Sequence, residues 1–561
     1  MTEIIFALSV VFVTAGVLLL VANQFGFSPI PFYIIAGLIA GQFIGPAVLV
    51  ELAQWGIAFL VFVFAIRIDL GDVQTVLRDA EIAAATQLLV VGTVAFAVGY
   101  GFTVAFEFEY PLRNAIYFSA AATFSSTLVG AGVLEEEIRN NLIYGRLASS
   151  IHFFDDVLAI AAVLVLSADV LTDAQIVTSQ IGYGVLFVLA GLVFYRHGFP
   201  LLSRVTEGDG ELLLMVSISI LIAFLAAAEA VGLSIVVGAF AAGIAIRAEG
   251  ARALEVRNGI ESIRDFFVAI FFVTLGALVQ IPTVEALVLA AVLFVLVAVL
   301  NPLVHTLTFL YEGYDARTSF LASSSLNQVS ELSLIIAIQA WWLGTISDHL
   351  FDAIILTAAL TMILTVVIRR YEEFLYRTVV ARLLGGHHTR YVDEHSRVED
   401  DLADHVVVVG YGRQGRRLVN TLETLDEPYV VVENDPVLRD DLETNCRNYV
   451  FGDAMAEYPM QQAQVSHARL VVSTVDHRAA SEALLERSTD ADRILRARSS
   501  RKARELLDAG ATFVMVPDVL AADQLIETVE RVVRDEREAS LLADEHFDVL
   551  EALEGSEADR R

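Results

Sequence analysis

This chain of 561 residues is poor in lysine and cysteine, with Lys502 as its single lysine and Cys446 as its single cysteine. One cysteine excludes an internal disulfide and is typical of a reducing compartment. Positive charge is also scarce, because 37 lysines and arginines face 68 aspartates and glutamates, for a net charge of -31. So acidic a chain repels nucleic acid, which removes that class of partner. Strong acidity with arginine in place of lysine indicates adaptation to high cytoplasmic salt, as in a halophile. The plainer explanation of the acidity is an acidic, soluble tail.

Apolar residues, in contrast, make up 56% of the chain, and the mean hydropathy is +0.63. The excess lies in residues 1–370, and the composition becomes that of a soluble domain after about residue 395. We therefore expect a membrane domain over 1–370, a linker over 371–403, a soluble domain over 404–532 and a disordered acidic tail over 533–561. The N-terminal stretch MTEIIFALSV lacks the positive charges of a cleaved signal peptide, so we interpret it as the first membrane span.

Thirteen apolar stretches approach the roughly 20 residues that a membrane-spanning helix requires. Their centres lie near residues 13, 38, 60, 95, 122, 155, 187, 221, 240, 271, 298, 329 and 359. If the C-terminus is cytoplasmic, the loops on that side hold Arg67, Arg78, Arg139, Arg146, Arg196, Arg204, Arg247, Arg252, Arg257, Arg264 and Arg317, whereas the other side holds Arg113. This asymmetry follows the positive-inside rule. It predicts a multi-pass plasma-membrane protein with its N-terminus outside and its C-terminal domain in the cytoplasm.

The sixth span contains the segment IHFFDDVLAI, in which Asp155 and Asp156 lie between long apolar runs. Successive helical residues point about 100° apart, so the two carboxylates meet different surroundings. A carboxylate at membrane depth is costly unless it pairs with a cation or takes up a proton. The pair therefore predicts exchange of a cation for protons, with helix capping as the structural alternative. His152 lies on the same helix face as Asp156, and we expect it to be a hydrogen-bonding neighbour of the site.

Two further spans, the fifth and the twelfth, are polar at their centres. They read YFSAAATFSSTLVGAG, with Thr123, Ser125, Ser126 and Thr127, and FLASSSLNQVSELSLI, with Ser323, Ser324, Ser325, Asn327, Gln328, Ser330 and Glu331. Such clusters predict helices that are interrupted where they line a cavity, a feature of transporters built from inverted repeats. We therefore expect an all-α membrane domain of inverted repeats, in which two broken helices cross. Intact helices with serine bonded to their own backbone are the alternative. Asn301, Pro302 and His305 predict a kink rather than a site.

The soluble part begins with HVVVVGYGRQGRRL, a strand that leads through Gly410, Gly412 and Gly415 into a helix. A second strand, PYVVVEND, ends at Glu433, where an acid accepts hydrogen bonds from a ribose 2′-hydroxyl and disfavours NADP. Four more strands follow, in RNYVFGDA, ARLVVSTV, RILRARSS and ATFVMVPDV. The pattern predicts an α/β Rossmann-like domain that binds a nucleotide, with an empty or repurposed cleft as the alternative. No catalytic cluster accompanies the motif, so binding for regulation is the more economical interpretation.

Together these residues resemble the Kef-type members of the monovalent cation:proton antiporter family, which carry a C-terminal KTN (RCK, TrkA-N) domain. The similarity covers residues 1 to about 530. In the membrane part it rests on WGIAFLVFVFAIRIDL, SAAATFSSTLVGAGVLEE, FFDDVLAI, GLSIVVGAFAAGIAI, FFVTLGALV and SLNQVSELSLI. In the soluble part it rests on VVVVGYGRQGRRL, VVVENDP, VFGDA and RILRARS.

The resemblance implies that Asp156 carries the ion and the proton, and that Asp155 is a secondary carrier typical of sodium-type electrogenic relatives. Those relatives have a lysine where this chain has Thr274, and the membrane part contains no lysine. The resemblance also implies a pathway lined by Thr123, Ser125, Ser126, Thr127, Thr274, Asn327, Gln328 and Glu331. It further implies a homodimer gated by NAD(H) or an adenine nucleotide, bound at Gly410, Gly412, Arg413, Gln414, Gly415, Glu433, Asp435 and Asp453.

The leading hypothesis is an antiporter that exchanges K⁺ or Na⁺ for protons across a lipid bilayer, under control of the nucleotide domain. A nucleotide-gated potassium channel is the first alternative, although the sequence has no TVGYG-like filter. A membrane-bound NAD-dependent oxidoreductase is the second, although the chain shows no second catalytic lobe.

Overall fold

The computed structural model describes residues 2–25, 28–67, 78–139, 142–166, 174–205, 210–246, 251–280, 282–384, 390–400, 402–487 and 490–534. The chain forms two compact units, Met1–His387 and His388–Arg561. The predicted tail lies almost wholly outside the described residues.

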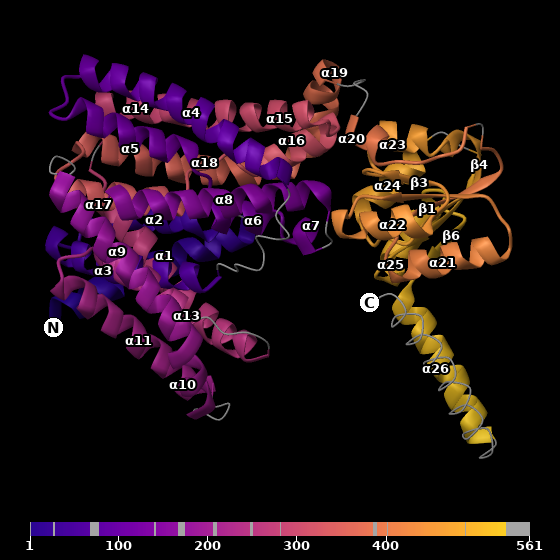
Figure 1. The fold of residues 1–561 in the computed structure, drawn as a ribbon, viewed down its shortest axis with the longest axis horizontal. Coiled ribbons are helices and arrows are strands. Elements are labelled where there is room, and N and C mark those ends of the chain that lie inside the picture. The colour runs from indigo at the N-terminus through magenta and orange to yellow at the C-terminus, as the bar shows by residue number, and fades with distance from the viewer. Residues whose placement is uncertain are drawn as a thin grey trace. The chain divides into compact units, whose positions relative to one another are not determined.

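The first unit is helical (Figure 1). Its first half contains α1 (Thr2–Phe25), α2 (Pro29–Ala40), α3 (Pro46–Arg67), α4 (Arg78–Ala105), α5 (Pro111–Thr123), α6 (Thr127–Val133), α7 (Glu135–Arg139), α8 (Ile143–Leu166), α9 (Ala174–Val193) and the π-helical η2 (Phe194–Gly198). Its second half contains α10 (Phe199–Val205), α11 (Gly210–Ala230), α12 (Ile235–Ala245), α13 (Ala251–Leu278), α14 (Val284–Val295), η3 (Leu296–Leu300), α15 (Asn301–Glu312), α16 (Ala316–Ser324), α17 (Glu331–Trp342), α18 (Asp348–Leu375), η4 (Tyr376–Val380) and α19 (Ala381–Leu384).

Within the described residues, each of the thirteen predicted spans coincides with one helix or with consecutive helices. Seven helices there are long and apolar enough to cross a membrane. Both spans that the sequence predicts to be interrupted are broken, because α5 and α6 are separated at residues 124–126 and α16 and α17 at residues 325–330. The prediction of an all-α membrane domain with two broken helices is therefore confirmed.

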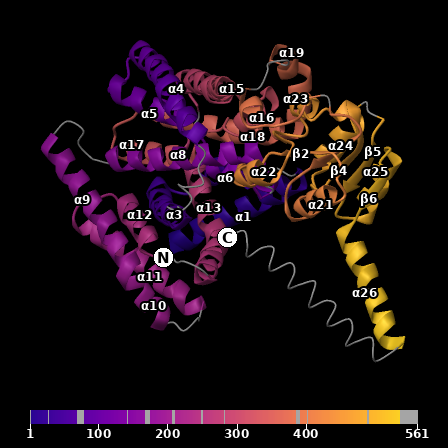
Figure 2. The same ribbon diagram turned by 45° about the vertical axis from the view of Figure 1, so that its right-hand side comes forward.

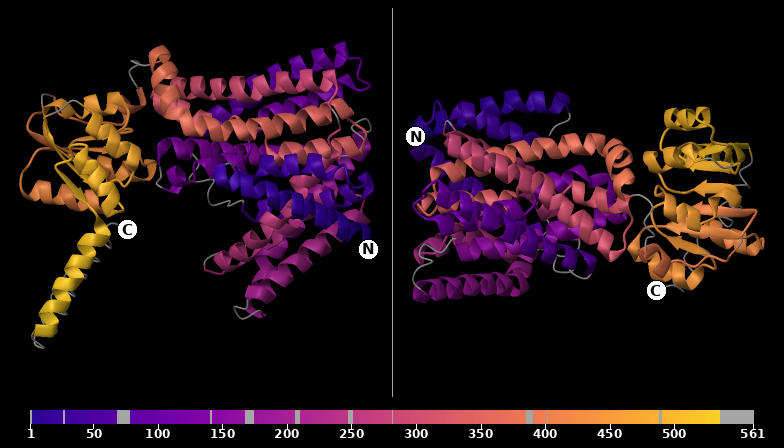
Figure 3. Two further views of the ribbon diagram at one scale, coloured as in Figure 1. Left: turned by 180° about the vertical axis from the view of Figure 1, so that it is seen from behind. Right: turned by 90° about the horizontal axis from the view of Figure 1, so that it is seen from above.

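The helices of this unit pack in two groups. In one group α4 packs on α5 and α15, and α14 packs on α18; in the other, α13 packs on α2 and α3, and α12 packs on α3, α9 and α11. Figures 1 and 3 show α8 between them, and Figure 2 shows α9 to α12 gathered on the side away from α4 and α5. Helix α8 contacts α4, α6, α16 and α17 as well as α9 and α12. The aspartate pair is thus carried on a helix that touches both groups.

Close packing of α2 on α13 depends on glycine. A Cβ at Gly276 would lie 2.0 Å from the carbonyl oxygen of Ile34, and a Cβ at Gly37 would lie 2.1 Å from that of Val273. Small residues allow the backbones of membrane helices to approach, since no hydrophobic effect drives them together in lipid.

The second unit is an α/β domain. It contains α20 (Arg390–Glu394), β1 (His405–Val409), α21 (Arg413–Thr424), β2 (Tyr429–Glu433), η5 (Pro436–Leu438), α22 (Arg439–Asn445), β3 (Tyr449–Phe451), α23 (Glu457–Gln462), η6 (Val465–His467), β4 (Ala468–Ser473), α24 (Arg478–Glu486), β5 (Asp492–Arg496), α25 (Ser500–Asp508), β6 (Phe513–Met515) and α26 (Pro517–Arg534). The strands are parallel in the order β3-β2-β1-β4-β5-β6. This is the Rossmann order, and all six predicted strands are present.

Candidate functional site

The breaks in the two interrupted helices lie against each other. Ser125 and Val329 form an antiparallel bridge, and the N–H of Ser330 donates to the carbonyl of Phe124 over 3.0 Å. Backbone groups that lose their helical partners at each break are therefore satisfied by the other break.

Asp155 anchors the first break. Its Oδ2 accepts hydrogen bonds from the N–H of Ser125 at 2.9 Å, from the Ser125 hydroxyl at 2.6 Å and from the Gln87 amide at 3.4 Å. The carboxylate is 1% exposed. These three donors carry no charge, so hydrogen bonds stabilise this buried carboxylate where the sequence offers no lysine.

Asp156 faces the start of the following half-helix. Its Oδ2 accepts a hydrogen bond from the Thr127 hydroxyl at 2.7 Å, and its side chain is also buried. The two adjacent carboxylates therefore meet different partners, as their 100° separation predicts: Asp155 meets the loop, and Asp156 meets the first residue of α6.

His152 is linked to Asp155 rather than to Asp156. Its Nδ1 lies 3.1 Å from the Ser125 hydroxyl, which in turn donates to Asp155. Its other ring edge is close to Gly130, where a Cβ would lie 2.3 Å from Nε2. His152 is thus a hydrogen-bonding neighbour of the site, as predicted, and the Ser125 hydroxyl connects it to Asp155.

Two polar residues near the second break, Gln328 and Glu331, reach across to the first broken helix, whereas Asn327 contacts α18. The Gln328 amide donates to the carbonyl of Ser126 at 3.0 Å, and the Glu331 carboxylate accepts from the N–H of Leu128 at 3.2 Å. Asn327 Oδ1 accepts from the Thr365 hydroxyl at 2.5 Å. Since Leu128 and Glu331 belong to the first turns of α6 and α17, the Glu331 charge stabilises the positive ends of both half-helices.

Two predicted pathway residues direct their hydroxyls to their own helices. The Thr274 hydroxyl donates to the carbonyls of Ile270 and Phe271, and the Thr123 hydroxyl donates to the carbonyl of Ser119. Thr274 lies on α13, which packs against α2 and α3, so the structure does not join its side chain to the carboxylate network.

Two amides at the crossing have contacts that the sequence did not predict, since Gln87 was not singled out and Asn301 was expected only at a kink. Asn301 donates to the carbonyls of Thr123 at 3.5 Å and Leu326 at 3.3 Å, and Gln87 donates to the same Thr123 carbonyl. The π-helical η3 directly before Asn301 agrees with the predicted kink, and the structure adds the contacts of the Asn301 amide with both broken helices. Both amides stabilise the negative C-terminal ends of half-helices, where N–H donors are favoured. The available signal was a lone amide in an apolar run, which is costly without a partner.

The glycine motif of the second unit forms a tight loop between β1 and α21. Gly410 has φ of +94°, and a Cβ at Gly415 would lie 2.0 Å from the Gly410 carbonyl oxygen. At Gly412 a Cβ would meet nothing within 4 Å, so that position is open. Arg413 and Gln414 are exposed at the first turn of α21. The loop thus fits a phosphate group approaching the helix N-terminus.

Glu433 closes the loop from β2. Its carboxylate accepts from the N–H groups of Tyr411 at 2.6 Å, Asn434 at 2.6 Å and Asp435 at 2.8 Å. Burial raises the pKa of this carboxyl, while the three N–H groups oppose the shift. Asp435 and Asp453 hold the turns after β2 and β3 by accepting from the N–H groups of Val437 and Met455. All of these acids lie at the carboxyl ends of strands, the edge at which Rossmann folds bind ligands.

The strand order reverses between β1 and β4. On the β4 and β5 side of this point lies a hollow of about 310 Å³. Its lining includes Asp476, Arg478, Arg496 and Lys502. Arg496 also donates to the Gln414 side chain at 3.2 Å, so the hollow adjoins the glycine loop.

Cys446 should react slowly with thiol reagents in the native protein. Burial raises the pKa of its thiol to about 11, against roughly 8.5 in an unfolded chain, and the thiolate is the reactive form. Between about pH 8.5 and pH 11 the thiol loses its proton in the unfolded chain but keeps it in the native protein. Its contribution to the free energy of unfolding is therefore fully present below about pH 8.5 and is lost as the pH rises toward 11. At pH 9 we expect iodoacetamide to label native protein at least about a hundredfold more slowly than protein in guanidinium. Equal labelling rates would contradict this expectation. The Cys446→Ala variant, which has no cysteine, measures background labelling of other residues.

Two protein families match this chain. Residues 8–370 match the family described as sodium/hydrogen exchanger, transmembrane, and residues 406–517 match the TrkA-N domain. The chain is 27% identical over 509 residues to the putative K⁺ efflux antiporter KefB of Alkalimonas amylolytica, covering 87% of this chain and 74% of the relative. It is 25% identical over 548 residues to the putative cation/proton antiporter YbaL of Escherichia coli strain K12, covering 92% and 96%. The solved structure of the sodium proton antiporter MjNhaP1 from Methanocaldococcus jannaschii is 15% identical, with a TM-score of 0.47, covering 69% and 99%.

Proposed function

This chain belongs to the sodium/hydrogen exchanger family, and on that premise we propose that it exchanges a monovalent cation, K⁺ or Na⁺, for protons by alternating access. The observation that carries the proposal is the buried pair Asp155 and Asp156, bonded to the break between α5 and α6. Asp156 is the primary carrier of the cation and the proton. The Thr127 hydroxyl bonds Asp156, while Gln328 and Glu331 bond Ser126 and Leu128 on either side of Thr127. These oxygen groups would line the pathway, and oxygen ligands suit K⁺ and Na⁺.

Asp155 has a different part in this proposal. Hydrogen bonds from Ser125 and Gln87 hold its carboxylate against the break, so its negative charge sets the field in which Asp156 binds a cation or a proton. That field influences how many charges move in each cycle.

Proteoliposomes with an imposed pH gradient test the exchange directly. Na⁺, K⁺ and Li⁺ are added in turn, with and without an imposed voltage, while a dye reports the internal pH. Proton movement driven by one of these cations supports the proposal, and dependence on voltage reveals net charge transfer. The proposal is overturned if none of the three cations moves protons in a preparation whose protein is folded and inserted.

We further propose that the second unit is a cytoplasmic regulatory domain that binds NAD(H) or an adenine nucleotide. Gly410, Gly412 and Gly415 would receive the phosphates, and Glu433 would position the ribose. The hollow lined by Arg496 and Lys502, next to the loop, favours the larger dinucleotide. The bound nucleotide would supply a ligand-dependent change in the domain's stability and not a catalytic step.

Gly412→Ala should weaken nucleotide binding without unfolding the domain. The added methyl group meets no protein atom within 4 Å, yet it occupies the space through which a phosphate reaches the loop. We expect the dissociation constant for NADH, measured by calorimetry on the full chain, to rise at least about tenfold. The unfolding temperature without ligand should equal that of the wild type. Unchanged NADH affinity in a folded variant would count against this site.

A homodimer is the expected assembly. Helix α26 exposes a set of large apolar side chains, consisting of Val519, Leu520, Leu525, Ile526, Val529 and Val533. An exposed apolar set of this size supports contact with a second chain.

A further inference from the structure

Polar residues recur every fourth position along α18, the helix that ends toward the linker. The series is Thr357, Thr361, Thr365, Arg369 and Glu373. Residues four apart lie on one face of a helix, so these side chains form a single stripe. Helix α18 packs against α5, α6, α16 and α17, which are the four half-helices of the crossing.

The middle of the stripe contacts the second break. The Thr361 hydroxyl accepts from the N–H of Val329 at 3.3 Å. The Thr365 hydroxyl lies 2.5 Å from Asn327 Oδ1 and 3.1 Å from Gln328 Oε1. Both threonines are fully buried or nearly so, at 0% and 1% exposure. The Thr365 hydroxyl has one proton and also lies 2.8 Å from the carbonyl oxygen of Thr361, so it donates to one of these three oxygens at a time. Because both amide oxygens of the break lie within hydrogen-bonding distance of this one hydroxyl, Thr365 keeps the two amides close to each other.

Gln328 passes this constraint to the first break. The Gln328 Nε2 donates to the carbonyl of Ser126 at 3.0 Å and to the carbonyl of Ser325 at 2.8 Å. Ser126 directly follows Ser125 in the first break. The same Ser125 gives two hydrogen bonds to Asp155. A continuous series of buried contacts therefore runs from Thr365 through one amide to the segment that carries the Asp155 donors.

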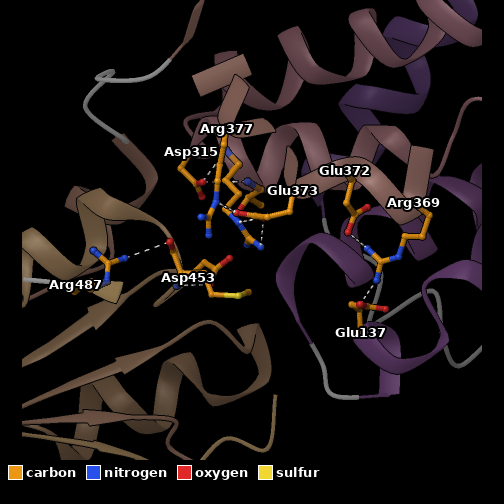
Figure 4. A network of polar contacts seen from close by, with 11 residues as sticks. Glu137, Asp315, Arg369, Glu372, Glu373, Arg377, Asp453 and Arg487 are labelled. Carbon is orange, nitrogen blue, oxygen red and sulfur yellow. Dashed lines mark hydrogen bonds and ion pairs between the residues drawn. The ribbon is translucent and has the colours of Figure 1, made fainter. Parts of the chain in front are cut away.

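The charged end of the stripe holds the outer ends of the same broken helices. Arg369 forms ion pairs with Glu372 on α18 and with Glu137 on α7, directly after α6 (Figure 4). Glu373 pairs with Arg317, in the first turn of α16, at 3.2 Å. Each broken helix is thus attached to α18 at its outer end, and the second break is attached at the crossing as well.

We propose that Thr365 is a positioning residue of the exchange site, which sets the spacing of the two breaks by orienting the Gln328 amide. The proposal rests on the proposed cation:proton exchange. Through Thr365, α18 connects the carboxylate network with the segment of the chain that leads to the nucleotide domain.

Thr365→Val tests this, since valine keeps the shape and removes the hydroxyl. We expect the half-saturating cation concentration of exchange to rise about tenfold, because misplaced ligands bind weakly. Thr365→Ser keeps the hydroxyl and should stay within about twofold of the wild type. Thr357→Val is the matched control, because the Thr357 hydroxyl bonds Ala290 and Ala353 outside the breaks. Equal half-saturation in Thr365→Val and Thr357→Val would overturn the proposal, as would a serine variant impaired like the valine variant.

Hydrogen exchange of the full chain gives a readout independent of transport. Amides of residues 325–330 should exchange faster in Thr365→Val than in the wild type and in Thr357→Val, because the break loses a fixed partner. Equal exchange in all three proteins would overturn the positioning role. Wild-type protein that moves no protons would instead reject the proposed function, while the hydrogen-exchange result would still decide the role of Thr365.

Discussion

Asp156→Asn is expected to lower cation-driven proton movement by at least about a hundredfold, because an amide cannot take up and release a proton in the working pH range. The change is nearly isosteric, and the Thr127 hydroxyl that donates to Asp156 Oδ2 can still donate to an amide oxygen. Proton movement in proteoliposomes, at matched protein content and for each cation in turn, is the measurement.

Asp155→Asn is the matched control for this experiment. It removes a charge from the neighbouring residue, while its amide oxygen can still accept from Ser125. We expect exchange to persist in this variant, with an altered dependence on imposed voltage. Exchange at the wild-type rate in Asp156→Asn would refute the assignment of the carrier, provided that both variants survive heating as the wild type does.

Gly276→Ala is expected to destabilise the membrane domain by about 3 kcal/mol or more, because the new methyl group has no space. Its Cβ would lie 2.0 Å from the backbone oxygen of Ile34, and a backbone atom cannot rotate away as a side-chain end can. Helices α2 and α13 would have to separate, and the contact at Gly37 would be lost with them. The fraction of protein that stays monodisperse after heating in detergent measures this.

Gly16→Ala serves as the control for this substitution. Gly16 lies on α1, and a Cβ there meets nothing within 4 Å, so the same methyl group should be tolerated. Equal heat resistance of the two variants would show that the approach of α2 to α13 contributes little to stability.

The missing lysine illustrates how the structure resolves a question that the sequence raises. The sequence places a second aspartate, Asp155, in the sixth span without a lysine anywhere in the membrane part. The structure surrounds Asp155 with a hydroxyl, a backbone N–H and an amide. Three neutral donors on one carboxylate oxygen stabilise the buried carboxylate locally, and they add no positive charge that would compensate it over longer distances.

The site could be predicted in part, because some of its features are local. Serine and threonine clusters predicted both breaks, and the glycine spacing predicted the loop between β1 and α21. Gln87, Asn301 and Thr365 could not be assigned in the same way. Each is an uncharged polar residue in a largely apolar helix, and its partners outside that helix lie 25 to 178 positions away in the chain.

The sequence by itself determined the division into a membrane part and a nucleotide-type domain, the polar centres of two spans and the position of the carboxylates. These follow from hydropathy, periodicity and motif spacing, which are properties of neighbouring residues. Only the tertiary structure decided which groups satisfy the interrupted backbone and the buried charges. Hydrogen bonds at a helix crossing depend on the packing of several helices, so Asp155 meets Ser125 and Gln87, and Gln328 meets Thr365, by an arrangement that no single segment specifies.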